Sequence, residues 1–124
     1  MKVAIVKKRA KIEKSLLLTL HISTECLLRG IHVTKSELEC LVLLSFENES
    51  SLATFCNNVV DKGIFSNPQT VRNFLAKSEK QGIVEKIQVP MSNKKNVSIK
   101  KSFTFTQEDN IILDYRFSYV SEKN

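Results

Sequence analysis

The spacing of the apolar residues changes at Gly82, and this change constrains the fold more than any other feature of the sequence. Before Gly82, apolar residues recur at intervals of three and four, as on the buried face of a helix. After Gly82 they alternate with polar residues, as in half-buried strands. The chain has 124 residues, enough for one domain with a single hydrophobic core. The sequence therefore predicts one α+β domain in which helices precede strands.

Helices are expected in four segments. The first, at about 11–29, is ambiguous, because its apolar residues fit both a helical stripe and the alternation of a strand. Its length favours a helix. Thr34 and Glu37 match a capping box, which begins a second helix that runs to about residue 47. Ser51 is a cap for a third helix, which is expected to end near Gly63.

The stretch SNPQTVRNFLAKSEKQGIVEK, residues 66–86, has the signals of a complete helix. Asn67 is a suitable cap, Pro68 suits the first turn, and Gly82 suits the position after the last turn. We expect this helix at about 68–81. Its apolar residues fall on one side, which leaves a polar and basic face on the other.

Strands are expected at 83–90 and 97–105, joined by a polar turn at 91–96, so that they form a β-hairpin. The alternation in 111–120 predicts an extra C-terminal strand, and KVAIV at 2–6 predicts a short N-terminal one. No stretch has the ~18 consecutive apolar residues of a membrane-spanning helix. The first residues do not have the pattern of a signal peptide. We therefore expect a cytoplasmic protein.

Net positive charge is confined to two parts of the chain. The net charge is +6, and residues 1–14 carry six Lys or Arg against one Glu, while residues 66–101 carry eight against two. The other two parts, 15–65 and 102–124, are net acidic. Segregated positive charge favours a polyanionic partner, although mild basicity is also common in small domains without one.

Three helices followed by a hairpin is the order of a winged helix. From VTKSELECLVLLSFEN to SFTF, residues 33–105, the chain resembles winged helix-turn-helix domains, particularly MarR-type transcriptional regulators. The resemblance rests on the Thr-led helix, on Leu52-Ala53 at the start of the next, and on FLAKSEKQGIVEK before the hairpin. It implies a three-helix core with a hairpin wing, preceded by an extension over 1–32 and followed by a strand and tail over 106–124.

The resemblance also implies a site. In such domains the third helix of the core enters the major groove of duplex DNA, where Arg reads guanine and Asn or Gln reads adenine. The residues expected at this nucleic-acid interface, on the helix and the wing tip, are Asn67, Gln69, Thr70, Arg72, Asn73, Lys77, Lys80, Lys94, Lys95 and Asn96. The alternative for the helix is an ordinary solvated face, and for the wing a set of lysines that protects a strand edge. The basic run at 7–14 fits either a phosphate-binding arm or the exposed side of the first helix.

Nothing in the sequence indicates an enzyme, a cofactor or a metal site. There is no glycine-rich phosphate loop, and the acidic residues are scattered. The three cysteines, Cys26, Cys40 and Cys56, lie too far apart for a zinc motif and are interpreted as buried, reduced residues. The two histidines, His21 and His32, are assigned to core or surface roles.

Two functions are compatible with these observations. The first is a small transcriptional regulator that binds duplex DNA. The second is a non-catalytic adaptor in a larger assembly, such as a phage particle or a polymerase or replication accessory, which would place it in a virion or nucleoprotein assembly. Tyr115, Phe117 and Tyr119 share one face of the expected last strand and are the candidate partner-binding residues. Either function is compatible with a homodimer or with a subunit of a larger protein assembly.

Overall fold

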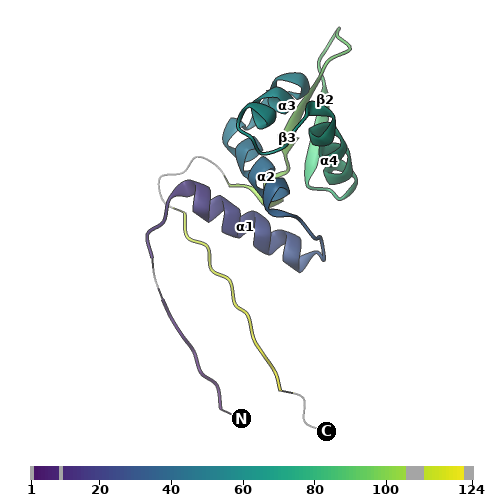
Figure 1. Ribbon diagram of the computed structural model, residues 1–124. Coiled ribbons are helices and arrows are strands. Elements are labelled where there is room, and N and C mark those ends of the chain that lie inside the picture. The colour runs from purple at the N-terminus through teal and green to yellow at the C-terminus, as the bar shows by residue number, and fades with distance from the viewer. Residues whose placement is uncertain (1, 9, 106–110, 122–124) are drawn as a thin grey trace.

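The computed structural model describes residues 2–8, 10–105 and 111–121 of the chain. Within them the elements are α1 (Lys14–Leu28), α2 (Lys35–Glu47), β1 (Glu49–Ser51), α3 (Leu52–Asp61), α4 (Pro68–Lys80), β2 (Val84–Gln88), β3 (Lys95–Ile99) and the 3-10 helix η1 (Lys101–Phe103). Figure 1 shows α2, α3 and α4 gathered around the strands, with α1 on the side of the two chain ends. The α+β class is confirmed, and this arrangement is compatible with a winged helix.

Local signals set the ends of the helices. Thr34 and Glu37 form the predicted capping box, in which Thr34 Oγ1 accepts from the Glu37 amide at 3.2 Å and the Glu37 carboxylate accepts from the Thr34 amide at 2.8 Å. Ser51 Oγ accepts from the Thr54 amide and caps α3. Gly82 follows α4 with a φ of +78°, a left-handed conformation that favours glycine. The last three predicted helices are therefore confirmed.

The ambiguous first segment is a helix, α1, which begins about three residues later than predicted. Leu18, Ile22 and Cys26 recur at intervals of four and are fully buried. They form the face that packs towards α2 and η1. A helix satisfies its own backbone hydrogen bonds along its length, whereas a strand here would need a neighbouring strand.

The sheet has the order β1-β3-β2 and is antiparallel throughout. β2 and β3 form the predicted hairpin, in which Val84 lies opposite Ile99. β1 pairs with the other edge of β3, where Ser50 lies opposite Val97. The sequence does not predict β1, because Glu49–Ser51 are polar and are interpreted as a break between two helices. This strand leads directly into α3 and ties the start of that helix to the hairpin.

One core joins all the helices to the sheet. Its largest fully buried side chains are Phe55, Phe103, Leu18, Ile22, Leu41, Leu44, Leu75, Ile83, Val59, Val71, Val84 and Val97. All three cysteines are free and buried in it, as the sequence predicts. Among the described residues, no helix is long and apolar enough to cross a membrane.

The strand predicted at 97–105 is too long. β3 ends at Ile99, and the chain then turns through η1. This turn buries Phe103 completely, and the guanidinium of Arg29 lies 4.5 Å from the centre of its ring. A continued strand would place every second residue on the same face of the sheet, whereas the turn brings Phe103 against α1.

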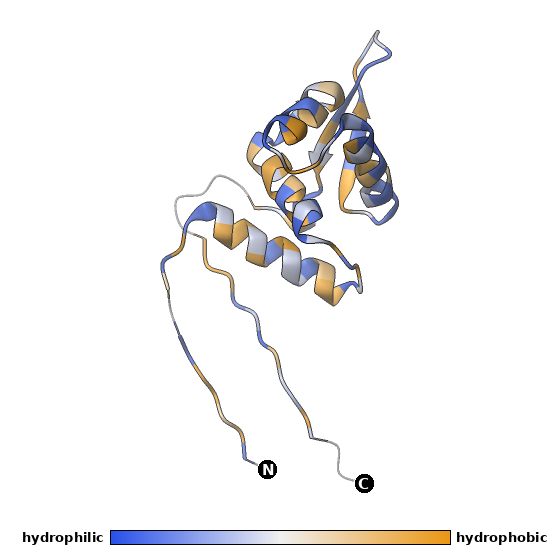
Figure 2. Cartoon of the chain, in the orientation of Figure 1, coloured by the Kyte–Doolittle hydropathy of each residue, from blue (hydrophilic) through white to orange (hydrophobic). Residues whose placement is uncertain are grey.

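The two strands expected outside the hairpin, at 2–6 and 111–120, are also wrong. Residues there belong to no strand, and the described chain has no other strand beside them. Figure 1 shows both segments extended on the α1 side of the molecule, away from the sheet, and Figure 2 shows that both carry apolar positions. Alternation alone does not make a strand, because the backbone groups need a partner strand to pair with.

Candidate nucleic-acid interface

α4 is held on the core by one face. Val71, Phe74 and Leu75 are buried, and so is the Ser78 side chain in the next turn. Asn67 caps the helix, because its Oδ1 accepts from the Thr70 amide at 2.9 Å and lies 3.0 Å from the Thr70 hydroxyl. The polar groups of Asn67 and Thr70, two of the predicted interface residues, are thus engaged in starting the helix.

The opposite face of α4 is exposed to solvent. Gln69, Arg72, Asn73 and Lys80 all lie on it. Gln69 Nε2 donates to Asn73 Oδ1 at 2.9 Å, one turn along the helix. This pair presents two amide groups side by side in the first half of α4, where a helix in the major groove meets base edges.

Lys77 lies on the flank of α4 rather than with these residues. Its Nζ is 4.0 Å from Glu37 Oε2 in the first turn of α2. The lysine side chain is 54% exposed, so this surface ion pair is weak and can exchange. Lys77 therefore lies beside the outer face and not at its centre.

A cleft of about 390 Å³ lies between the start of α3, the outer face of α4 and the turn that joins β2 to β3. This hairpin is the predicted wing, and its turn is the wing tip. Its lining residues are Ser51, Leu52, Ala53, Thr54, Arg72, Asn93, Lys94 and Lys95. Three of them, Arg72, Lys94 and Lys95, are predicted interface residues from elements more than 20 residues apart. The fold therefore brings one predicted part of α4 and one predicted part of the wing to a common cavity.

The start of α3 is the part of this cleft that the sequence did not assign to a site. The first amides of a helix have no carbonyl partner within the helix, and they carry a partial positive charge. The sequence predicted Ser51 only as the cap that begins this helix, and not as part of a binding site. The start of α3 lies beside the wing because β1 pairs with β3, and the sequence did not predict this pairing.

Backbone and side-chain hydrogen bonds hold the wing tip. The Val89 amide donates to the Lys94 carbonyl at 3.0 Å, and the Lys94 amide donates to Ser92 Oγ at 3.1 Å. Asn96 Nδ2 donates to Glu49 Oε2 at 2.8 Å, so this predicted interface residue is directed to β1 instead. Within the described residues, neither Lys94 nor Lys95 takes part in a salt bridge.

The predicted partner-binding residues separate into two kinds. Tyr115 is half-buried, and its hydroxyl hydrogen-bonds to Nδ1 of His21 on α1. Nε2 of the same ring lies 3.2 Å from the Ser102 carbonyl, which can only accept, so Nε2 carries a proton and, in the neutral imidazole, Nδ1 accepts from Tyr115. Phe117 and Tyr119 are 67% and 91% exposed. His21 was assigned only a core or surface role in the sequence, and the structure shows it anchoring the C-terminal segment.

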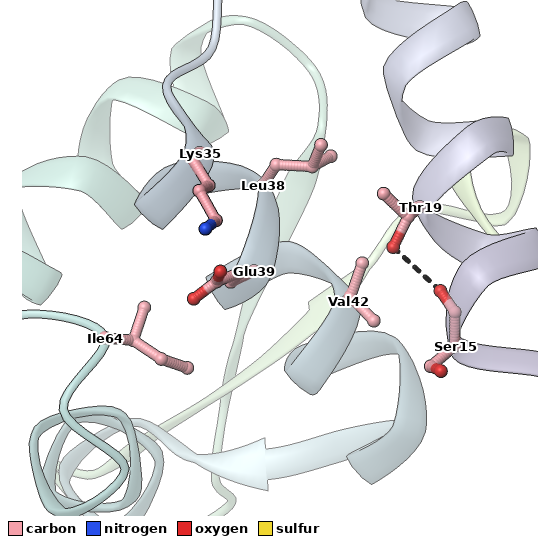
Figure 3. Close-up of a pocket in the computed structure, with 7 residues that line it drawn as sticks. All are labelled: Ser15, Thr19, Lys35, Leu38, Glu39, Val42 and Ile64. Atoms are coloured by element: carbon pink, nitrogen blue, oxygen red, sulfur yellow. Dashed lines mark hydrogen bonds between the residues drawn. The ribbon is translucent and has the colours of Figure 1, made fainter.

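A second hollow of about 390 Å³ lies between α1 and α2 (Figure 3). Its lining residues are Ser15, Thr19, Lys35, Leu38, Glu39, Val42 and Ile64. The Thr19 hydroxyl donates to the Ser15 carbonyl at 2.7 Å, so it is engaged within its own helix. None of the predicted site residues lies here.

The pKa values of all three thiols are raised above the usual value for cysteine. Burial, with smaller contributions from the neighbouring Cys56, Glu37 and Glu47, raises the pKa of Cys40 to about 12. Burial also raises the pKa of Cys26 and of Cys56, although Arg72 acts in the opposite direction on Cys56. A protonated thiol is a poor nucleophile and a poor metal ligand. In the described residues, no three His, Cys, Asp or Glu side chains are grouped to hold a metal ion.

Comparison with known proteins adds no family to this geometry. No protein-family model matches the chain, and neither a curated protein nor a solved structure matches it.

Proposed function

We propose that this chain is a DNA-binding winged-helix protein, a small regulator similar to the MarR type, that holds duplex DNA with α4 and the wing. The observation that supports this most directly is the cleft shared by Arg72 of α4, Lys94 and Lys95 of the wing, and the start of α3. Three positive side chains and a helix N-terminus around one cavity form a suitable place for a phosphate group.

In this proposal the two parts of the interface have different tasks. Lys94 and Lys95 bind backbone phosphates, which positions the protein but does not read sequence. Gln69 and Asn73 face base edges in the major groove, where side-chain amides pair with adenine. Arg72 lies between the two parts, within reach of a phosphate or a guanine. Lys80 lies further along α4, on the side that would approach the DNA backbone.

The test is binding of the purified protein to random duplex DNA at about 50 and 200 mM salt. Each neutralised phosphate contributes about −0.9 to the slope of log affinity against log salt. The double variant Lys94→Ala/Lys95→Ala is therefore expected to make that slope less negative by roughly 1.8. Arg72→Ala is expected to weaken binding as well.

The matched control is Lys100→Ala/Lys101→Ala. It removes two adjacent, exposed lysines at the opposite end of β3, away from the wing tip. Loss of binding in the wing variant but not in the control supports the proposal. No binding at about 50 mM salt, or equal losses in the two double variants, rejects it.

The adaptor function is the second candidate, and it is favoured by the exposed Phe117 and Tyr119. In that case DNA binding is absent, and Arg72→Ala leaves the protein's interactions unchanged. Replacing Phe117 and Tyr119 by serine then abolishes assembly with the partner protein, which distinguishes this function from DNA binding.

A further inference from the structure

α1 has apolar residues on two opposite sides. Leu18, Ile22 and Cys26 face the core and are buried. Leu16, Leu20 and Leu27 lie on the other side, together with Ser23, and the three leucines are 49%, 48% and 68% exposed. A helix that is apolar on all sides is normally buried on all sides. We name Leu16, Leu20, Ser23 and Leu27 the outer stripe of α1.

The outer stripe also lacks charge. There is no Asp, Glu, Lys or Arg between Lys14 and Glu25. The flanking charges are already engaged within the chain, because Lys14 lies 5.2 Å from the centre of the Phe46 ring and Glu25 pairs with Arg29 at 3.5 Å. Absence of charge is typical of the centre of a protein interface and not of an ordinary solvated helix.

The two extended segments also carry exposed apolar side chains. Figure 1 shows both chain ends on the α1 side of the molecule, beyond that helix. The exposed apolar side chains of these segments are Val3, Ile5, Val6, Ile112, Phe117, Tyr119 and Val120. Within the described residues, their backbones form no strand pair. The segments therefore have both apolar side chains and backbone groups that a partner can engage.

The area of this surface is that of a dimer interface. We allow roughly 100 Å² for a fully exposed aliphatic side chain and roughly 200 Å² for an aromatic one. The exposed apolar residues of α1 alone then give roughly 200 Å², which is too little, but with the two segments the total is roughly 900 Å². A standard interface buries about 800 Å² on each partner.

We propose that the outer stripe of α1 and the two extended segments form an interface with a second copy of this chain. The outer stripe is complementary to itself. In an antiparallel pair of α1 helices with a two-fold axis beside residues 21 and 22, Leu16 faces Leu27 of the second copy, and Leu20 faces Ser23. The large Leu20 then lies against a small residue, as close packing requires. The extended segments flank the helix pair and bind across it.

The experiment is sedimentation of the full chain over about 1 to 100 μM, which covers the weak end of the micromolar to picomolar affinities that interfaces of this size have. We expect a species of two 14.1-kDa chains at the higher concentrations. Ser23→Glu is expected to raise the dissociation constant about tenfold or more, because it places an unpaired charge against Leu20 of the second copy. Leu27→Lys is a second variant at an exposed position and is expected to act in the same way.

Asn57→Glu is the control, since it adds the same charge at an exposed position on α3, outside the proposed interface. It is expected to leave the dissociation constant unchanged, and circular dichroism is used to check that all three variants are folded. A wild-type chain that is monomeric at about 100 μM overturns the proposal and favours a different protein as partner. A dimer that is unaffected by both Ser23→Glu and Leu27→Lys also overturns it. The measurement needs no DNA, so its outcome is independent of the proposed function.

Discussion

Replacing Leu75 by alanine tests whether α4 is held in place by its buried face alone. Leu75 is fully buried in the core, whereas Arg72, one turn earlier, is exposed. A Leu→Ala change in a core typically costs 2–5 kcal/mol, because it loses apolar contacts and leaves a cavity. We take about 3 kcal/mol for Leu75→Ala. An exposed residue with no special role usually changes stability by less than about 0.5 kcal/mol, which is our expectation for Arg72→Ala.

The assay is urea unfolding followed by helix circular dichroism. With a slope of about 1.5 kcal/mol per molar urea, Leu75→Ala is expected to lower the midpoint by roughly 2 M. The melting temperature is expected to fall by roughly 12 °C, at about 4 °C per kcal/mol for a chain of this size. Leu75→Met is the control, because it conserves volume and costs less than about 1.5 kcal/mol. A loss below about 1 kcal/mol for Leu75→Ala, or an equal loss for Arg72→Ala, refutes the assignment of faces on α4.

Three further predictions concern the start of α2, the reactivity of the thiols and the pH dependence of stability. Thr34→Ala is expected to lower the free energy of unfolding in urea by about 1 kcal/mol, because the Thr34 hydroxyl no longer accepts from the Glu37 amide. Thr34→Ser keeps this hydroxyl and is the control. Alkylation at pH 8 is expected to be slow for the folded chain and fast in urea, as measured by mass spectrometry on Cys26, Cys40 and Cys56. Because folding raises the pKa of Cys40 to about 12, its contribution to stability is complete below about pH 9 and is lost as the pH rises towards 12. Rapid labelling of the folded chain at pH 8 contradicts the burial of these thiols.

The elements that the sequence predicted correctly depend on local signals. The capping box at Thr34 and the cap at Asn67 both act within four residues of the chain, and Gly82 ends α4 through its own backbone conformation. Such signals do not depend on the rest of the fold, so a pattern in the sequence is enough to locate them. The β2–β3 hairpin belongs to the same group, because its strands are joined by a short turn.

The elements that were missed or wrong depend on contacts between distant residues. β1 is a strand only because β3 lies beside it, more than 40 residues later in the chain. Conversely, 111–120 alternates clearly, but none of the residues that the structure describes forms a strand beside it. The alternation still has a physical meaning up to Tyr115, since Ile111, Leu113 and Tyr115 are half-buried and Ile112 and Asp114 are exposed. The pattern thus indicated which side of this stretch is partly covered, but not the type of secondary structure.

The candidate site shows the same division between local and distant information. The sequence alone indicates Arg72, Lys94 and Lys95, because their charges lie on a predicted helix face and in a predicted turn. The start of α3 could not be chosen, because it reaches the cleft only through the β1–β3 pairing. The cleft therefore depends on a strand of three residues, and a change that weakens β1 should disturb the site while leaving the helices intact.

The two proposed surfaces lie on different parts of the molecule, and this separation has a consequence. The cleft is formed by α3, α4 and the wing, whereas the outer stripe belongs to α1, on the side of the chain ends. A second copy bound through α1 therefore leaves both clefts open. Two such sites related by a two-fold axis fit a DNA sequence with matching two-fold symmetry. Since each copy would then hold the other close to the same duplex, a variant that breaks the α1 contact, such as Ser23→Glu, should weaken DNA binding by the full chain without altering any residue of the cleft.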